Sequence, residues 1–252
     1  MDEIRIYSWQ HFATAASEVP RGRFLWRGQR DPGWPLASSL ERRVLALWGA
    51  QNGGPGSVYP YSGRPTPTEK ETIAAWTQGL QNHFSRAIVG VPGAPRSRPN
   101  GTELWALGRH YGLITPLLDW SLNHYFAAFF ALTDGGRSMT SPTHDVAIYR
   151  LDYGRHLDLT GILLHDNLWL PDLHRLHRQA GVFTQLDGSV AYEIEGACVR
   201  GNEPGSIKKY VIDKTIVESA LRDLRAHGVD FNLVYPDVEG AALFANRMLF
   251  GD

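Results

Sequence analysis

The chain has 252 residues, of which 43% are hydrophobic and 11% aromatic, enough apolar side chain for a sizeable core. Its 25 basic and 26 acidic residues give a formal net charge of -1, so overall charge favours neither nucleic acid nor an anionic membrane as partner. The single cysteine excludes an internal disulfide and a cysteine-based zinc site, and the ten histidines form no HExxH motif.

No run of about 18 apolar residues is present, and the N-terminal MDEIRIYSWQ lacks the charged and apolar regions of a signal peptide. We therefore expect one domain over residues 1–252, soluble and cytoplasmic, with no membrane contact and no bound metal.

The start of the chain predicts a helix, a short strand and a second helix. The helix is expected over Trp9–Glu18, and the alternation within Arg23–Gln29 is typical of a strand. Ser38 or Ser39 is expected to cap the helix that follows.

Arg27 stands near the end of the predicted strand, and Gly28 after it permits close approach of another backbone or of a ligand. A guanidinium beside exposed backbone suits a phosphate or carboxylate. An ion-paired or solvent-facing Arg27 is the alternative.

Residues 49–67 are rich in Gly, Pro and Ser and predict an exposed loop or mobile lid. A helix is expected over Thr68–Ile88, with Thr68 and Glu71 at the spacing of a capping box. A shorter helix over Glu103–Tyr111 would end just before a glycine.

The stretch over residues 108–132 concentrates polar and aromatic side chains before the most apolar helix-like segment of the chain. Its candidate functional residues are His110, Tyr111, Thr115, Asp119 and Trp120. The helix after them would be held in the core by its Phe and Ala face, so the preceding loop should hold its polar groups rigidly. We interpret this loop as the centre of the functional site.

Two residues could cap that apolar helix, Ser121 or Asn123. Its inward face is predicted to carry Phe126, Ala127, Phe130 and Ala131.

The second half predicts more strands and two helices. Strands are expected at residues 146–149, Gly181–Thr184, Val190–Glu195, Lys208–Ile212 and Leu233–Tyr235, and helices at Thr215–His227 and Val238–Leu249. The predicted fold class is α+β, a mixed or antiparallel sheet in the second half packed by helices from the first around one cleft.

Four segments in this order resemble the FRG domain family, named for its Phe/Arg/Gly motif. They are FLWRGQ at 24–29, HYGLITPLLDWSLNHYFAAFFA at 110–131, RQAGVFT at 178–184 and FNLVYPDVEG at 231–240. The resemblance spans roughly residues 5–245. It departs from the family pattern in Leu25-Trp26 before Arg-Gly and in Ser121 after Asp-Trp. Membership of the family implies no assigned activity.

A weaker resemblance is to the ADP-ribosyltransferases, which place an Arg, a Ser/Thr strand and a Glu in the same order. It implies a similar fold, with NAD as co-substrate. It also implies that a positive charge develops on the ribose as nicotinamide leaves, and that a nearby acidic residue stabilises this charge.

Carried over residue by residue, Arg27 would contact the phosphates or ribose and Thr115 would stand at the Ser/Thr position. Gln179 would lie near the acidic motif, but RQAGV contains no glutamate. The catalytic acid would then be Asp119 or the Glu193/Glu195 pair, and His110 would join the catalytic group.

Gly28, Gln29, Tyr111, Trp120 and Gln179 would line the NAD site beside Arg27.

Each candidate also has a structural explanation. His110 alone is typical of a helix C-terminus, and Asp119 among apolar residues would need a partner, Arg27 or a helix N-terminus. Glu193 and Glu195 alternate as on a solvated strand face, and Gln179 could bond a base edge, the nicotinamide amide or a backbone turn.

Trp26, Trp34 and Trp120 could stack on a ring or belong to the core.

Two functions remain open. One is an ADP-ribosyltransferase-like toxin or defence effector, with NAD as donor, a protein, RNA or DNA acceptor and an antitoxin-like inhibitor as partner. The other is a non-catalytic module that binds a nucleotide, a nucleic acid or a partner protein in the same pocket.

Overall fold

The computed structural model describes residues 2–20, 22–52, 66–92, 101–133, 142–154, 160–166, 168, 174–187, 193–201 and 203–250. Its strands form one seven-stranded sheet in the order β1-β7-β4-β2-β3-β6-β5. The strands are β1 (Asp2–Ile6), β2 (Phe24–Gln29), β3 (Leu117–Ser121), β4 (Val146–Asp152), β5 (Ile162–His165), β6 (Gly181–Leu186) and β7 (Ile207–Ile212). Only the β1–β7 pairing is parallel among the described strand pairs, so the sheet is mixed and mostly antiparallel.

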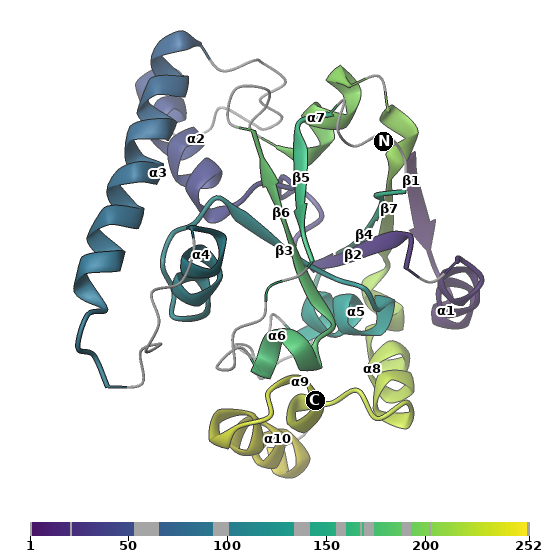
Figure 1. The fold of residues 1–252 in the computed structure, drawn as a ribbon. Helices are drawn as coiled ribbons and strands as arrows, with labels where there is room; N and C mark the ends of the chain where they lie inside the picture. Colours follow the sequence, from purple (N-terminus) through teal and green to yellow (C-terminus); the bar gives the residue numbers. More distant parts are fainter. Residues whose placement is uncertain are drawn as a thin grey trace.

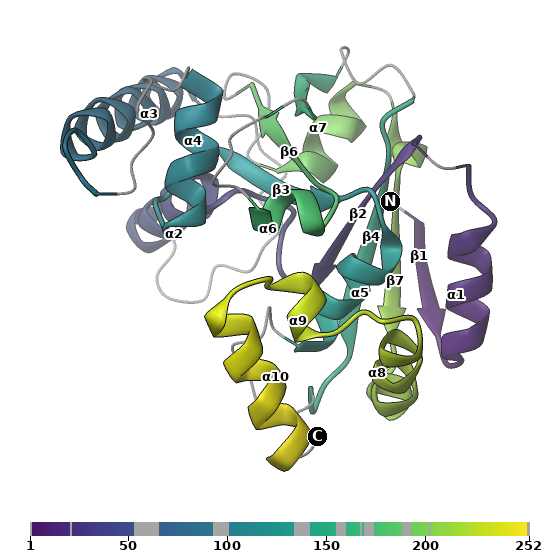
Figure 2. The ribbon, with the colours of Figure 1, turned by 60° about the horizontal axis from the view of Figure 1, so that its bottom comes forward.

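Helices surround this sheet (Figures 1 and 2). They are α1 (Trp9–Ser17), α2 (Ser39–Asn52), α3 (Pro67–Ala87), α4 (Gly101–His110), α5 (His124–Thr133), α6 (His174–Arg178), α7 (Ile194–Arg200), α8 (Val217–Ala226), α9 (Phe231–Val234) and α10 (Val238–Phe250). None of the helices in the described segments combines the length and apolar character needed to cross a membrane.

The two faces of the sheet bury different sets of side chains. On one face α1, α5 and α8 pack over the strands, with Phe12, Phe129 and Leu221 in a core that includes Trp26. On the other face α7 buries Ile194 against the strands. Figure 1 shows α2, α3 and α4 grouped together, away from α1 and α8.

Helix α5 packs unusually close to β2. A Cβ atom built on Gly28 would lie 1.9 Å from the carbonyl oxygen of Ala127, so only glycine fits between strand and helix. The predicted cap is confirmed, since the Asn123 side chain accepts a hydrogen bond from the Tyr125 N–H at 2.9 Å. Phe126, Ala127 and Ala131 are buried, as their spacing predicts, whereas Phe130 is only partly buried.

The middle of the sheet is split. β2 and β3 are neighbours, yet they pair only at Trp26 and Ser121. β2 pairs with β4 along its whole length, and β3 pairs with β6 from Leu117 to Ser121. The strands therefore diverge after Trp26, and this divergence places Arg27 and Asp119 on either side of an opening.

Most of the predicted elements are present, and the α+β class with a mixed sheet is confirmed. The sheet is not confined to the second half, however, because β1, β2 and β3 belong to the first. The helices α7 and α8 of the second half also pack on it. Alternating apolar residues identify a strand but not its neighbours, which are set by long-range pairing.

Two predicted strands are wrong. Of the strand predicted over Val190–Glu195, residues 190–192 lie outside the described residues, and the rest is not a strand, because α7 begins at Ile194 and Glu193 precedes it as the N-cap residue. Leu233–Tyr235 is also not a strand, because α9 covers these positions up to Val234. In both places buried residues recur at helical spacing, and short apolar runs do not distinguish the two periods.

The capping box of α3 lies two residues before the predicted one. Thr66 accepts from the Glu69 N–H at 3.3 Å, and the Glu69 carboxylate accepts from the Thr66 N–H at 2.6 Å. Pro67 occupies the first turn, where its fixed φ suits the helix. Residues 49–52 belong to α2 rather than to a loop, and residues 53–65 of the predicted lid lie outside the described residues.

His124 begins α5 with its ring 5.6 Å from that of Trp26 and 4.2 Å from that of Tyr125. Burial, with a smaller effect of His227, lowers the pKa of His124 to about 4. The unfolded chain therefore binds the proton more readily than the native one, and stability should fall as pH drops from about 6.5 toward 4. Denaturant unfolding across this range should show the loss.

The variant His124→Phe, which keeps the aromatic contacts, should flatten this part of the pH profile. His83→Phe, on the exposed side of α3, is the control. An identical pH dependence in wild type and His124→Phe would show that another group carries the effect.

Candidate functional site

A cleft of about 880 Å³ opens where β2 and β3 diverge. Its walls come from β2, β3, β6, α2, α4, α5, α6 and the segment from α9 to α10. Ligand cavities in proteins commonly measure roughly 300–1,000 Å³, so the cleft has room for a ligand of nucleotide size.

Asp119 lies at the centre of one end of this cleft, on β3 and not in a loop as predicted. The guanidinium of Arg109 donates from Nε to both carboxylate oxygens, at 3.2 and 3.1 Å, and forms a close ion pair through Nη2. Burial raises the pKa of Asp119, but the charge and hydrogen bonds of Arg109 outweigh burial and hold this pKa below its usual value. Asp119 is therefore ionised at neutral pH.

Arg27 binds the same residue from β2. Its Nη1 donates to the backbone oxygen of Asp119 at 2.7 Å and lies 3.7 Å from the carboxylate. Burial, together with the nearby charges of Arg109 and Arg42, lowers the pKa of Arg27 to about 10 against the attraction of Asp119. Arg27 still carries its charge at pH 7.

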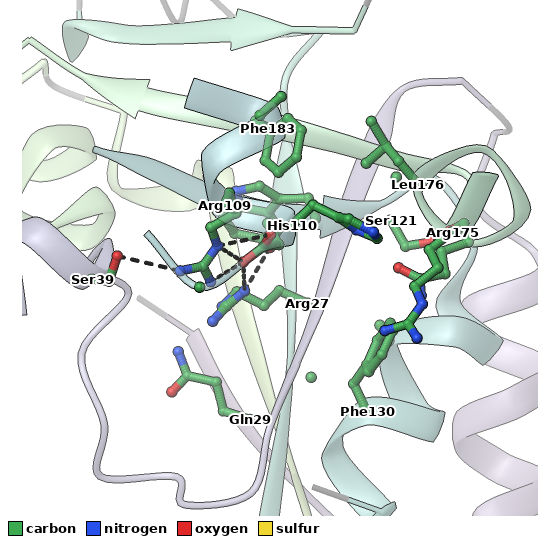
Figure 3. Close-up of a pocket in the computed structure, with 18 of the residues that line it drawn as sticks. Arg27, Gln29, Ser39, Arg109, His110, Ser121, Phe130, Arg175, Leu176 and Phe183 are labelled. Carbon is green, nitrogen blue, oxygen red and sulfur yellow. Dashed lines mark hydrogen bonds and ion pairs between the residues drawn. The ribbon is translucent and has the colours of Figure 1, made fainter. Parts of the chain in front are cut away.

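The predicted partner of Asp119 is thus confirmed in part. Arg27 is one partner, but Arg109 makes the closer contact. In Figure 3 the Arg27 and Arg109 side chains point toward one another and Ser39 approaches Arg109 from α2. Nη1 of Arg109 donates to Ser39 Oγ at 3.3 Å, which ties the start of α2 to this end of the cleft.

Two guanidiniums around one carboxylate leave a net charge of about +1 by formal count. Arg42 also lines the cleft and acts on Arg27 through its charge. We call Arg27, Arg42, Arg109 and Asp119 the basic end of the cleft.

The opposite end is acidic. Arg175 on α6 forms ion pairs of 2.6 Å with both Asp237 and Glu239, which gives a formal net charge of -1. The same guanidinium lies 5.0 Å above the ring of Tyr235, which lines the cleft. Figure 3 shows Arg175 and Phe130 on the side of the cleft away from Ser39, Arg27 and Arg109. We call Arg175, Asp237 and Glu239 the acidic end.

His110 ends α4 and lines the cleft, half-buried. Burial lowers its pKa, Arg175 lowers it further, and Asp237 opposes the shift. A neutral imidazole is therefore expected at pH 7.

Thr115 does not line the cleft. It is fully buried, and its backbone bonds to Ser39, accepting from the hydroxyl at 3.2 Å and donating to it at 3.0 Å. Arg27, His110 and Asp119 meet in one cleft as predicted, whereas Thr115 supports α2 behind it.

Glu193 and Glu195 take no part in the lining of this cleft, since they belong to the start of α7 on the opposite side of the sheet from α5. Their predicted placement on a strand is wrong for the reason given above.

Among the predicted NAD-contacting residues, Gly28, Gln29, Trp120 and Gln179 line the cleft. Tyr111 is exposed and lies outside the lining. Gln179 donates to the Val234 carbonyl at 3.0 Å, a backbone contact that anchors α9.

The tryptophans divide between core and cleft. Trp120 is buried and donates to Thr184 Oγ1 at 2.8 Å, and Trp26 is buried in the core beneath α5. Trp34 lines the cleft with 45% of its surface exposed, so of these three tryptophans it is the one available for stacking.

Sequence reasoning missed the arginines other than Arg27, and it missed Glu239. Arg109 stood beside His110 in the same stretch, and a carboxylate among apolar residues requires a cation nearby. Glu239 stood in the family-like segment at residues 231–240 without a role assigned to it, and Arg175 stood in none of the four segments. Separate elements bring the two residues to the cleft. The described residues contain no group of three or more His, Cys, Asp or Glu side chains that could hold a metal ion.

The model of the FRG domain family matches residues 22–139 of the chain. This range contains β2, α2, α4, β3 and α5, and therefore the whole basic end. The two later segments that resemble the family, residues 178–184 and 231–240, lie outside it. Neither a curated protein nor a solved structure matches the chain at a significant level.

Proposed function

The chain carries an FRG domain over residues 22–139, which supplies the whole basic end of the cleft, and from the chemistry of that end we propose that the cleft binds NAD. The observation that carries this proposal is the pair of guanidiniums held on Asp119. Arginine is the side chain best suited to phosphate, because its planar fork donates two parallel hydrogen bonds. The pyrophosphate of NAD would lie against Arg27 and Arg109.

The charge distribution supports a ligand that is negative at one point and positive at another. NAD carries its negative charge on the pyrophosphate and a positive charge on the nicotinamide ring. In the proposed complex the pyrophosphate occupies the basic end, and the nicotinamide riboside extends toward the acidic end, beside Phe130 and Tyr235.

The proposed reaction is ADP-ribosyl transfer by an ADP-ribosyltransferase-like fold. Nicotinamide leaves with the electron pair of its bond to the ribose, and a nucleophile of a protein, RNA or DNA acceptor takes its place. A toxin or defence effector held in check by an antitoxin-like partner is the biological setting that this chemistry suits. Growth arrest on expression, relieved by an Arg27 variant, would support that setting.

A second candidate is a module that binds the nucleotide without cleaving it. The observation in its favour is the state of Asp119, whose carboxylate is already occupied by two arginines. Calorimetric binding of NAD with no nicotinamide release, in the presence of protein, RNA and DNA acceptors, would favour this candidate.

The variant Arg27→Ala should weaken NAD binding roughly 10- to 100-fold, the usual worth of a charge-assisted hydrogen bond. The fold should be little affected, because Arg109 still neutralises Asp119. Titration calorimetry together with thermal unfolding measures both effects.

The matched control is Arg222→Ala, which removes an exposed arginine of α8. It should leave NAD affinity unchanged. If wild type does not bind NAD, or if Arg27→Ala binds it as tightly as wild type, the proposed ligand is wrong.

A further inference from the structure

The two carboxylates in the lining of the cleft, among the described residues, have different electrostatic surroundings. Asp119 at the basic end lies between two arginines. Glu239 at the acidic end shares a single arginine, Arg175, with Asp237. The charge of Asp119 is therefore more than compensated, whereas the charge of Glu239 is compensated only in part.

The two side chains also differ in access. Glu239 exposes 66% of its side chain and Asp119 exposes 42%. Asp119 is held on both oxygens by Arg109, so a ligand would have to displace a bidentate pair to reach it. Among the contacts of the described residues, Arg175 binds Glu239 through Oε2 alone, and most of the Glu239 side chain stays exposed at the cleft.

The backbone holds Glu239 firmly in place. Asp237 Oδ1 accepts from the Gly240 N–H at 3.0 Å, which caps the start of α10 around Glu239. A Cβ atom on Gly240 would lie 1.8 Å from the Tyr235 oxygen, so the turn from Tyr235 to Gly240 is compact. The turn fixes the backbone at Glu239, and the ion pair with Arg175 orients its carboxylate. Electrostatic stabilisation of a developing charge depends on such orientation.

We propose that Glu239 is the catalytic carboxylate of the cleft, an inference that rests on the proposed use of NAD. When the bond between nicotinamide and the ribose C1′ breaks, its electron pair leaves with nicotinamide, and the positive charge of the pyridinium ring moves onto the ribose. Glu239 stabilises this oxocarbenium ion. The acceptor then forms a new bond to C1′ and gives up its proton to the carboxylate.

Asp119 has a different role in this assignment. Its surroundings carry a net positive charge, which would oppose a cation on the ribose and favour the pyrophosphate. Asp119 is thus a positioning residue that orients Arg27 and Arg109. The ADP-ribosyltransferase resemblance calls for a glutamate near residues 178–182, and RQAGV contains none. In this assignment the glutamate comes from the start of α10, outside the residues 22–139 that match the family model.

The test is steady-state nicotinamide release by the full chain carrying Glu239→Gln. This variant keeps the size of the side chain and removes its charge. We expect kcat to fall roughly 100- to 1,000-fold, as when one group that stabilises the transition state is lost. NAD affinity, measured by calorimetry, should change by less than about threefold, because the pyrophosphate contacts remain.

Asp237→Asn is the matched control, because Asp237 shares Arg175 with Glu239 but does not line the cleft. Asparagine also retains the side-chain oxygen that caps Gly240. Its kcat should fall by less than about tenfold, since only a more distant charge is lost.

Equal losses in the two variants would overturn the assignment and show that Glu239 merely anchors Arg175. Wild-type turnover that persists in Glu239→Gln would overturn it as well, while leaving the proposed function intact. If wild type binds NAD but releases no nicotinamide, both the transferase reaction and the role of Glu239 are wrong.

Discussion

Gly28→Ala is expected to destabilise the fold by about 3 kcal/mol or more, because its methyl group would meet backbone rather than a movable side chain. The new Cβ would lie 1.9 Å from the Ala127 oxygen and 2.6 Å from the Ala131 nitrogen. Strand β2 and helix α5 would have to separate, and both belong to the main core. Chemical denaturation of the purified variant measures the loss.

The matched control is Gly79→Ala in the interior of α3, where an added Cβ meets nothing within 4 Å. This variant should gain about 0.5–1 kcal/mol, because alanine loses less backbone entropy than glycine in a helix. A Gly28→Ala protein as stable as wild type would show that α5 does not pack against β2 as described.

The separation of β2 and α5 in Gly28→Ala would also affect the cleft, because Gly28 and Ala127 both line it. The close approach of α5 positions the wall beside Arg27. We therefore expect Gly28→Ala, where it folds, to lose nucleotide binding as well as stability.

Arg109→Ala is expected to cost about 2 kcal/mol, less than a fully buried pair would, since Asp119 is partly exposed. The substitution leaves the Asp119 carboxylate with Arg27, 3.7 Å away, as its remaining cation among the ion pairs described. It should therefore be more destabilising than Arg27→Ala. Urea unfolding of the two variants side by side gives the comparison.

The double variant Arg109→Ala with Asp119→Asn removes the stranded charge and should recover most of the loss.

The stability that the Asp119 ion pair contributes should also depend on pH. The folded-state pKa of Asp119 is depressed, so its contribution is present above the unfolded pKa of about 3.9 and is lost as pH falls through the folded value. A double variant less stable than Arg109→Ala alone would contradict this account of the pair.

Residues of the candidate site were predictable where the neighbouring residues in the sequence indicated their role. Asp119 among apolar residues required a partner, and Arg27 before Gly28 indicated a guanidinium next to a close backbone approach. Both residues are in the cleft. Glu193 and Glu195 were misplaced because the alternation that suggested a strand was too short to exclude a helix.

The basic end of the cleft was easier to predict from the sequence than the acidic end. Arg27, Arg109 and Asp119 lie in segments whose motifs stand out in the sequence. The sequence did not indicate, however, that Arg109 is the closest ion-pair partner of Asp119. Arg175 comes from α6, which carries no distinctive pattern around it, and Glu239 comes from the start of α10, where the family-like segment 231–240 assigned it no role. Their importance comes only from their position on the same cleft.

By itself the sequence determined most of the local elements, the buried α5 helix, the FRG resemblance and the concentration of polar residues around Asp119. Periodicity, capping and glycine placement are local properties, so they can be recognised along the chain. Only the tertiary structure decided the strand order, the divergence of β2 and β3, and the opposite charges at the two ends of the cleft. These depend on pairings between distant residues, and the field at any point is the sum of charges from several elements.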